Sequence, residues 1–286
     1  MSWCAYRLAY RLESPLHSGW RKTGNLMQTR PFVPGRTWWG AATSHLTQWK
    51  GSCDYEAEGK FLKNNLVFGY FFLAEDPDVP LAPCWEEGCL RYGPLSADEF
   101  ERCFISSRAS TAIDYRHNTA DEGQLHEVEF IVPRTGRGDV FLVGHLLARE
   151  GDRVTCNERD VIVDGLPLLS EVLSGLRIGG ERRYGFGHLL LHEARRCEDI
   201  FGHRLAERDD ERPIVELNQE LPVPAHLEAA DFKAAGQIEP LVGREWDLNR
   251  GPGRAHSDVL ICWMPGSKTI RNYRAKVIEM GIWTVT

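Results

Sequence analysis

The sequence predicts an α+β fold whose core is a split β-α-β arrangement of ferredoxin-like type. Strand-like and helical patterns alternate along the first two thirds of the chain, and the apolar runs 66–73 and 140–147 are dense enough to be buried strands. A glycine-rich segment, 178–188, opens directly onto a third apolar run, 189–191. Strand, helix, buried strand, then strand, helix and a strand after the glycine segment is the element order of such a core.

The first predicted strand covers residues 5–16, where apolar and polar residues alternate imperfectly. We place the end of this strand near Pro15, because proline cannot donate the backbone hydrogen bond that a central strand requires. A loop over 17–25 follows, and the stretch 20–31 contains no Asp or Glu. The cationic or titratable side chains of this loop are His17, Arg21 and Lys22.

A turn at Pro34-Gly35 precedes a predicted helix over 38–49, and Thr37 is its expected N-cap. Trp38 and Trp39 are predicted to be core residues rather than ligand contacts, because large aromatic side chains dominate core packing.

The middle of the chain predicts an exposed excursion between two strands. The strands cover 104–110 and 125–132, and the stretch between them is polar and rich in turn residues. After the buried strand over 140–147, residues 166–178 have helical spacing and lead into the glycine-rich segment.

The segment 178–188 has the composition of a loop that lies against a phosphodiester backbone. Its four glycines permit positive φ and the close approach of another backbone. The guanidinium fork of Arg182 and Arg183 suits phosphate, and the rings of Tyr184 and Phe186 can stack on bases. The alternative interpretation is a glycine-rich hairpin with ordinary surface arginines.

Composition limits the classes of partner. The net charge of −7 argues against a protein that grips nucleic acid over its whole surface, but a local basic groove is compatible with it. Arginine is concentrated around 21–36, 108–116 and 177–183. No apolar run is long enough to span a bilayer, no secretory signal is evident, and the eight cysteines are scattered. We therefore expect a cytoplasmic protein with reduced thiols and no membrane partner.

Charge and proline content rise after residue 195, which indicates a boundary near 197. Residues 1–196 are predicted to form the core, with the excursion near 108–132. Residues 197–286 are predicted to form a C-terminal extension that contains β-structure and packs on the core.

Cysteine side chains can bind zinc, and zinc is the only cofactor considered for this sequence. The C-x4-C spacing in the middle of the chain is only loosely like that of a zinc finger, so buried or incidental thiols are the favoured interpretation. The zinc candidates are Cys53, Cys84, Cys89 and Cys103.

Three segments resemble, in order, parts of RAMP-superfamily subunits of type III CRISPR effector complexes. Residues 14–19 and 32–41, with the turn and helix start PGRTWWGA, resemble the opening of these subunits. Residues 112–129 resemble the thumb of type III subunits, and 179–187 resembles the glycine-rich loop of the superfamily. A weaker similarity links the tail to the C-terminal strands of larger type III members.

The resemblance implies a ferredoxin-like (RRM-like) core, a β-hairpin thumb and a crRNA held by its sugar-phosphate backbone for antiviral defence. It also implies assembly with other RAMP subunits, with a large signature subunit and, through the crRNA, with target RNA. The subunit would either repeat along the guide or cap its 5′ handle, and the long C-terminal extension favours the cap. The RNA-binding residues expected on this basis are His17, Arg21, Lys22, Arg36, Arg108, Arg116, His117, Arg182, Arg183, Tyr184 and Phe186.

The resemblance also bears on catalysis. Target-cleaving backbone subunits carry an Asp in the loop after the first strand, but here that loop has no acid, and Glu13 and Asp54 lie outside the matching positions. No catalytic residue is therefore assigned, although a target-cleaving subunit stays open as an alternative. A second alternative is a crRNA-processing endoribonuclease with His17, His45 or His117 as acid-base groups. A third is a structural protein whose basic loops bind an acidic partner chain.

Overall fold

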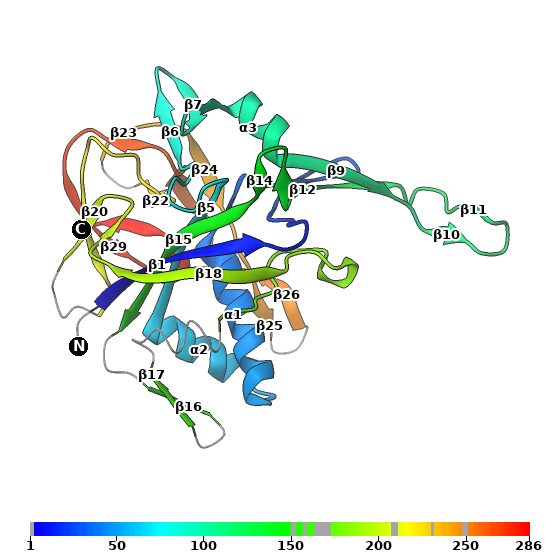
Figure 1. The fold of residues 1–286 in the computed structure, drawn as a ribbon, viewed down its shortest axis with the longest axis horizontal. Coiled ribbons are helices and arrows are strands. Elements are labelled where there is room, and N and C mark those ends of the chain that lie inside the picture. Colours follow the sequence, from blue (N-terminus) through cyan, green and yellow to red (C-terminus); the bar gives the residue numbers. More distant parts are fainter. Residues whose placement is uncertain are drawn as a thin grey trace.

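The computed structural model describes residues 3–149, 153–156, 159–162, 173–206, 211–229, 232–247 and 251–286. The fold is mixed α+β, as predicted, and is rich in strands, with three α-helices in the described ranges. Figure 1 shows a layered body from which one long hairpin projects.

The central sheet has the order β18-β1-β15-β5-β4, and all neighbouring strands are antiparallel. Strands β1 and β5 therefore run parallel to each other with β15 between them, and α1 lies in the connection from β1 to β5. This arrangement is compatible with the split β-α-β geometry predicted for the first half of the core. The bounds are β1 Trp3–Leu12, β4 Phe32–Val33, α1 Gly35–Lys50, β5 Leu66–Ala74, β15 Phe141–Arg149 and β18 Leu189–Cys197.

Helix α1 begins three residues earlier than predicted. Pro34 is the N-cap and no side chain caps the helix, so the expected cap at Thr37 is wrong. Proline suits this position because it has no N–H to leave unsatisfied. The helix ends at Gly51, which adopts the left-handed conformation with φ 64°. As predicted, Trp38 is completely buried, and its ring centroid lies 4.0 Å from that of Phe71.

Two further helices were not predicted from the sequence. Helix α2, Tyr55–Asn65, begins at Asp54, whose carboxylate accepts the backbone N–H of Ala57 at 2.9 Å. Helix α3, Ala97–Phe104, begins with a capping box between Ser96 and Glu99. It ends where strand β9 starts.

The projecting hairpin consists of β9, Ile105–Ser110, and β12, His126–Ile131, which pair antiparallel over their full lengths. These strands confirm the predicted strands over 104–110 and 125–132. A second short pair, β10 Ile113–Asp114 and β11 Thr119–Ala120, lies at the tip (Figure 1). At its base β12 also pairs in parallel with β3, which completes a four-stranded sheet of order β2-β3-β12-β9. The remaining strands of this sheet are β2 Gly19–Thr23 and β3 Leu26–Thr29, so the predicted loop over 17–25 is partly a strand.

The C-terminal part contributes an eight-stranded sheet of order β19-β20-β21-β29-β30-β22-β27-β24. Its apolar face, including Val215, Val277 and Trp283, packs with Phe72 and Leu147 on one face of the central sheet. Helices α1 and α2 pack on the opposite face. The bounds are β19 Asp199–Ile200, β20 His203–Leu205, β21 Ile214–Leu217, β22 Leu227–Glu228, β24 Ile238–Leu241, β27 Leu260–Trp263, β29 Tyr273–Val277 and β30 Trp283–Val285.

Small sheets and turns complete the described residues. A three-stranded sheet is formed by β6 Pro83–Glu86, β7 Cys89–Tyr92 and β8 Leu95–Ser96. Two-stranded pairs are β13 Arg134–Thr135 with β14 Gly138–Asp139, β16 Arg153–Cys156 with β17 Arg159–Ile162, β23 Ala234–Ala235 with β28 Lys268–Thr269, and β25 Arg244–Asp247 with β26 Gly251–His256. The 3₁₀ turns are η1 Arg182–Tyr184 and η2 Glu279–Gly281.

The helix predicted ahead of the glycine-rich segment is not found in the residues that the structure describes. Of the helix predicted over 166–178, residues 166–172 lie outside the described residues, and 173–178 contain no helix. The β-structure predicted for the C-terminal extension is present, and near the end of the chain residues 277–283 form the end of β29, the turn η2 and the start of β30. None of the helices in the described ranges has the length and apolar character that crossing a membrane requires.

Candidate nucleic-acid interface

The glycine-rich segment 178–188, here called the glycine loop, lies against the chain that leaves the first strand. The backbone N–H of Gly180 donates to the carbonyl of His17 at 2.9 Å, and the N–H of Gly187 donates to the carbonyl of Pro15 at 2.7 Å. The hydroxyl oxygen of Ser14 accepts the N–H of His188 at 3.0 Å. Two motifs far apart in sequence therefore form one surface.

Two of its glycines are required by this contact. Gly179 and Gly187 have φ angles of 83° and 78°, in the left-handed region. A Cβ atom on Gly179 would lie 2.4 Å from the carbonyl oxygen of His17, and one on Gly187 would lie 1.9 Å from that of Ile178. The close approach of the backbones thus excludes any side chain at both positions.

The loop presents its charged and aromatic residues to solvent at the turn η1. Arg182 and Arg183 are exposed and form no ion pair within the described ranges. The ring of Tyr184 is 75% exposed. Two cations and one aromatic ring are therefore available to an external ligand.

Two other predicted contact residues are buried. Phe186 is 7% exposed, and its ring packs edge-on against Phe130 of β12 with centroids 5.5 Å apart. His17 is 8% exposed, and its Nδ1 lies 2.7 Å from the carbonyl oxygen of Glu129. Both side chains fasten the glycine loop and its neighbouring segment to the base of the hairpin. These two side chains therefore hold the surface in position, whereas Tyr184 is the aromatic residue of the loop whose ring is exposed.

The four-stranded sheet carries a row of side chains on one face. Lys22 pairs with Met27, Met27 with Val128, and Val128 with Arg108 in the strand registers. Residues directly opposite each other point to the same face of a sheet. The row therefore has a cation at each end and apolar side chains between them.

A hollow of about 70 Å³ lies where this face meets the glycine loop. The hairpin forms one wall and the glycine loop the other, so the structure brings Arg108 together with Tyr184 and Phe186. The lining residues are Arg108, Ser110, His126, Val128, Glu181, Tyr184 and Phe186.

The other predicted contact residues lie further from this hollow. The guanidinium of Arg21 stacks 4.0 Å from the centroid of the Trp20 ring on β2. Arg36 is half-buried in the first turn of α1, where its guanidinium packs against Gly243.

Arg116 and His117 lie at the hairpin tip, away from the body (Figure 1). There, the hydrogen bond from the side chain of His117 and that from the backbone N–H of Arg116 lower the pKa of Asp114.

The residues considered for catalysis are dispersed. His17 lies beside the hairpin base, His45 on α1 and His117 at the hairpin tip. Among the acids considered, Glu13 pairs with Arg11 at 2.6 Å and Asp54 caps α2.

The zinc candidates are also spread over several elements. Cys53 precedes α2, Cys84 and Cys89 lie on β6 and β7, and Cys103 lies on α3. In the described ranges, no three His, Cys, Asp or Glu side chains are grouped so that they could hold a metal ion.

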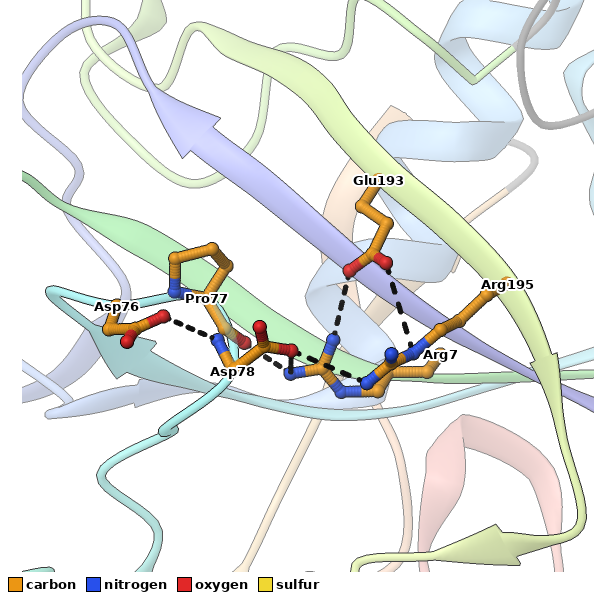
Figure 2. A network of polar contacts seen from close by, with 6 residues as sticks. All are labelled: Arg7, Asp76, Pro77, Asp78, Glu193 and Arg195. Atoms are coloured by element: carbon orange, nitrogen blue, oxygen red, sulfur yellow. Dashed lines mark hydrogen bonds and ion pairs between the residues drawn. The ribbon is translucent and has the colours of Figure 1, made fainter.

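A separate ionic network lies on the central sheet and was not predicted. Figure 2 shows Arg7 between Glu193, at 3.1 Å, and Asp78, at 3.9 Å, while Arg195 approaches Asp78 at 3.4 Å. Arg7 also donates to the carbonyl of Pro77. Each charge has an opposite neighbour, so this network fastens the loop after β5 to β1 and β18 and offers no unpaired charge to a ligand.

Sequence reasoning missed four residues that line the hollow: Ser110, His126, Val128 and Glu181. Alternation along the predicted strands puts Arg108 and Ser110 on one face, and His126 and Val128 on one face, but it does not give the register that brings the pairs together. Glu181 could have been noticed in the sequence, because it is the one acidic residue of the otherwise cationic segment 178–188.

Comparisons with known proteins agree with this architecture. The family model described as "RAMP superfamily" matches residues 10–189, and no curated protein matches. Two solved structures are similar to the chain, with a TM-score of 0.54 each and coverage of 92% of this chain. One, described as type III-B Cmr-beta bound to cognate target RNA, is 13% identical over 86% of its chain. The other, described as the same complex with target RNA and AMPPnP, is 12% identical over 85%.

At this identity the structural similarity concerns the fold alone. The family match covers more than half of the chain and includes the end of β1, the hairpin and the glycine loop. The chain belongs to the RAMP superfamily.

Proposed function

We propose that this chain is a non-catalytic crRNA-binding subunit of a type III CRISPR ribonucleoprotein effector, which serves RNA-guided antiviral defence. One observation carries the proposal: the glycine loop and the hairpin meet at a hollow lined by Arg108 and by Tyr184, whose ring is exposed. Arg182 and Arg183, the two residues before Tyr184, are exposed and form no ion pair within the described ranges. The similarity to chains of type III-B Cmr-beta complexes with bound target RNA supports the choice of ligand and of complex.

The binding mode follows from the charges. Arg182 and Arg183 contact phosphates, which fixes the position of the strand without reading its sequence. Tyr184 stacks on a base, and Arg108 and Lys22 extend the cationic surface along the four-stranded sheet. Because the whole chain carries a charge of −7, we expect binding to use a local cationic surface such as this one rather than the whole exterior.

The hairpin is assigned as a thumb that crosses the guide, with Arg116 and His117 at its tip. Residues 1–196 are assigned as a ferredoxin-like core and 197–286 as its extension, which the order β18-β1-β15-β5 supports. The eight-stranded sheet favours a capping position at the 5′ handle, next to other RAMP subunits and the large signature subunit.

The test is the salt dependence of RNA binding by the Arg182→Ala/Arg183→Ala variant. Each lost phosphate contact lowers the slope of log K against log salt by about one, so the double variant should lose about two units. Arg204→Ala/Arg274→Ala is the matched control, since both arginines are exposed on the C-terminal sheet. An unchanged slope for the glycine-loop variant, equal to that of the control, would refute the proposal.

A further inference from the structure

The glycine loop contains one residue that a phosphate-binding loop should avoid. Glu181 precedes the two arginines, and it lines the hollow together with Arg108. A carboxylate repels phosphate, and no described residue forms an ion pair with Glu181. It also adopts a left-handed conformation, with φ 55°, which is uncommon for a residue other than glycine. A role in phosphate binding does not account for this residue.

The polar groups that line the hollow divide into acceptors and donors. An ionised carboxylate only accepts hydrogen bonds, and a guanidinium only donates them. Glu181 supplies the first from the glycine loop and Arg108 the second from β9. Ser110 and His126, a cross-strand pair on the same face as Arg108, add groups that can do either.

Guanine is the base that complements this set. On its Watson–Crick edge the N1–H and the N2 amino group are adjacent donors for a carboxylate, and O6 beside them is an acceptor for a guanidinium. Uracil offers only one donor, while adenine and cytosine offer a single amino group. We propose that the hollow between the hairpin and the glycine loop reads the edge of one unstacked guanine in the bound RNA, an inference that rests on the proposed function.

The position of the hollow sets how the base enters. The hollow lies on the surface between the hairpin and the glycine loop, so a base approaches it from solvent by one edge. It admits an edge of the base and leaves the ring face outside, where the exposed ring of Tyr184 is available for stacking. Val128 and Phe186, which are buried, supply an apolar floor.

The inference is tested by equilibrium binding of the full chain to oligouridine of about 12 nucleotides, with and without one central guanosine. The guanosine should tighten binding about tenfold. Inosine, which lacks the N2 amino group, should lose part of this gain, whereas 7-deazaguanosine, whose Watson–Crick edge is intact, should keep it. Equal affinity for oligouridine and for the guanosine-containing RNA overturns the inference.

The variant Glu181→Gln separates base reading from folding. Losing the charge should tighten binding to oligouridine and reduce the guanosine preference, whereas damage to the fold would weaken both. Glu220→Gln, at an exposed position on the C-terminal part, should change neither value. Full retention of the preference in Glu181→Gln refutes the assignment.

The two proposals fail in different ways. If oligouridine binding depends on Arg182 and Arg183 but guanosine adds nothing, the proposed function stands and the guanine site is wrong. If the chain binds neither RNA, both are wrong.

Discussion

Glu239 joins the C-terminal sheet to the rest of the molecule through three side chains that donate to it, and one of these, His226, also contacts Tyr70. Its Oε1 accepts a hydrogen bond from Arg30 at 2.8 Å and another from Nε2 of His226. Its Oε2 accepts the indole N–H of Trp20 at 3.3 Å, and Nδ1 of His226 lies 2.6 Å from the hydroxyl of Tyr70. The carboxylate is buried but satisfied, and Arg30 balances its charge.

Buried titratable groups predict how stability depends on pH. Burial alone would raise the pKa of Glu239, but the hydrogen bond from His226 and the charge of Arg30 outweigh it and lower that pKa to about 2. Burial lowers the pKa of His226, and it lowers the pKa of His145 to about 3. In acid the unfolded chain therefore binds more protons than the folded chain at all three residues.

We expect the free energy of unfolding to fall as the pH drops below about 6.5, where unfolded histidine becomes charged. The loss should continue to about pH 3 for His145, and Glu239 should add to it below about pH 4.5, its ordinary value, until its folded pKa is passed. Urea unfolding at a series of pH values measures this. His145→Leu, which removes one titrating group, should flatten the upper part of the curve. A constant midpoint between neutral pH and pH 4 would contradict the expectation.

Gly185 and Gly187 form a matched pair for the glycine loop. Both have positive φ, but a Cβ on Gly185 meets nothing within 4 Å, whereas one on Gly187 would clash with the carbonyl of Ile178. We expect Gly185→Ala to cost about 1 to 2 kcal/mol from its left-handed backbone alone. Gly187→Ala should cost more and should also weaken RNA binding, because the loop must move. Thermal unfolding and RNA titration of both variants measure these effects. Equal losses of stability and of RNA affinity in the two variants would argue against the close approach of Gly187 to Ile178.

At the scale of elements, the hairpin tip is separable from the body. Ile113, Tyr115 and Leu125 are exposed there, so the tip contributes little burial. The backbone N–H of Asp121 donates to the carbonyl of Ala112 at 2.9 Å, which brings the ends of the segment 113–120 together. A short turn can therefore replace this segment.

We expect replacement of 113–120 by a two-residue turn to leave the unfolding temperature unchanged and to weaken assembly on crRNA. The reason is that the tip has no core contacts but carries Arg116 and His117 toward the guide. Calorimetry measures the first effect and reconstitution of the complex the second. Undiminished assembly would show that the hairpin is not a thumb.

Some elements could be predicted from the sequence and others could not, and the reasons for the difference are physical. The strands of the hairpin alternate apolar and polar residues, as a half-buried sheet requires, and could be predicted. Helix α2 buries only Glu58, Gly59 and Leu62, so its apolar pattern is too weak to detect. The bond between Trp20 and Glu239 joins positions 219 residues apart, and no local pattern encodes such a pairing.

At the scale of the whole molecule, the central sheet is covered on both faces. Helix α1 covers one face, and the C-terminal sheet buries Phe32, Phe72 and Leu147 on the other. The turn η2 packs closely against Phe68 of β5. A Cβ atom on Gly281 would lie 2.3 Å from the carbonyl oxygen of Phe68, so a side chain does not fit at this position. The strands of the C-terminal sheet are two to five residues long, too short for periodicity to reveal. The C-terminal extension thus covers an apolar face of the central sheet that is separate from the face covered by α1.

We expect a fragment that ends at Cys197 to aggregate or to unfold without cooperativity, since removing the second sheet exposes the apolar face that it covers. Size-exclusion chromatography and urea unfolding of the fragment, beside the full chain, measure this. A monomeric fragment with a cooperative unfolding transition would mean that the residues up to Cys197 fold without the C-terminal extension.

The central claim is that the glycine loop and the hairpin base together hold RNA. A cryo-EM map of the effector particle that contains this chain and its guide tests it most directly. We expect phosphate density beside Arg182 and Arg183, a base stacked against Tyr184 and the hairpin lying across the RNA strand. A guide that runs along the C-terminal sheet instead, with the glycine loop facing solvent, would contradict it.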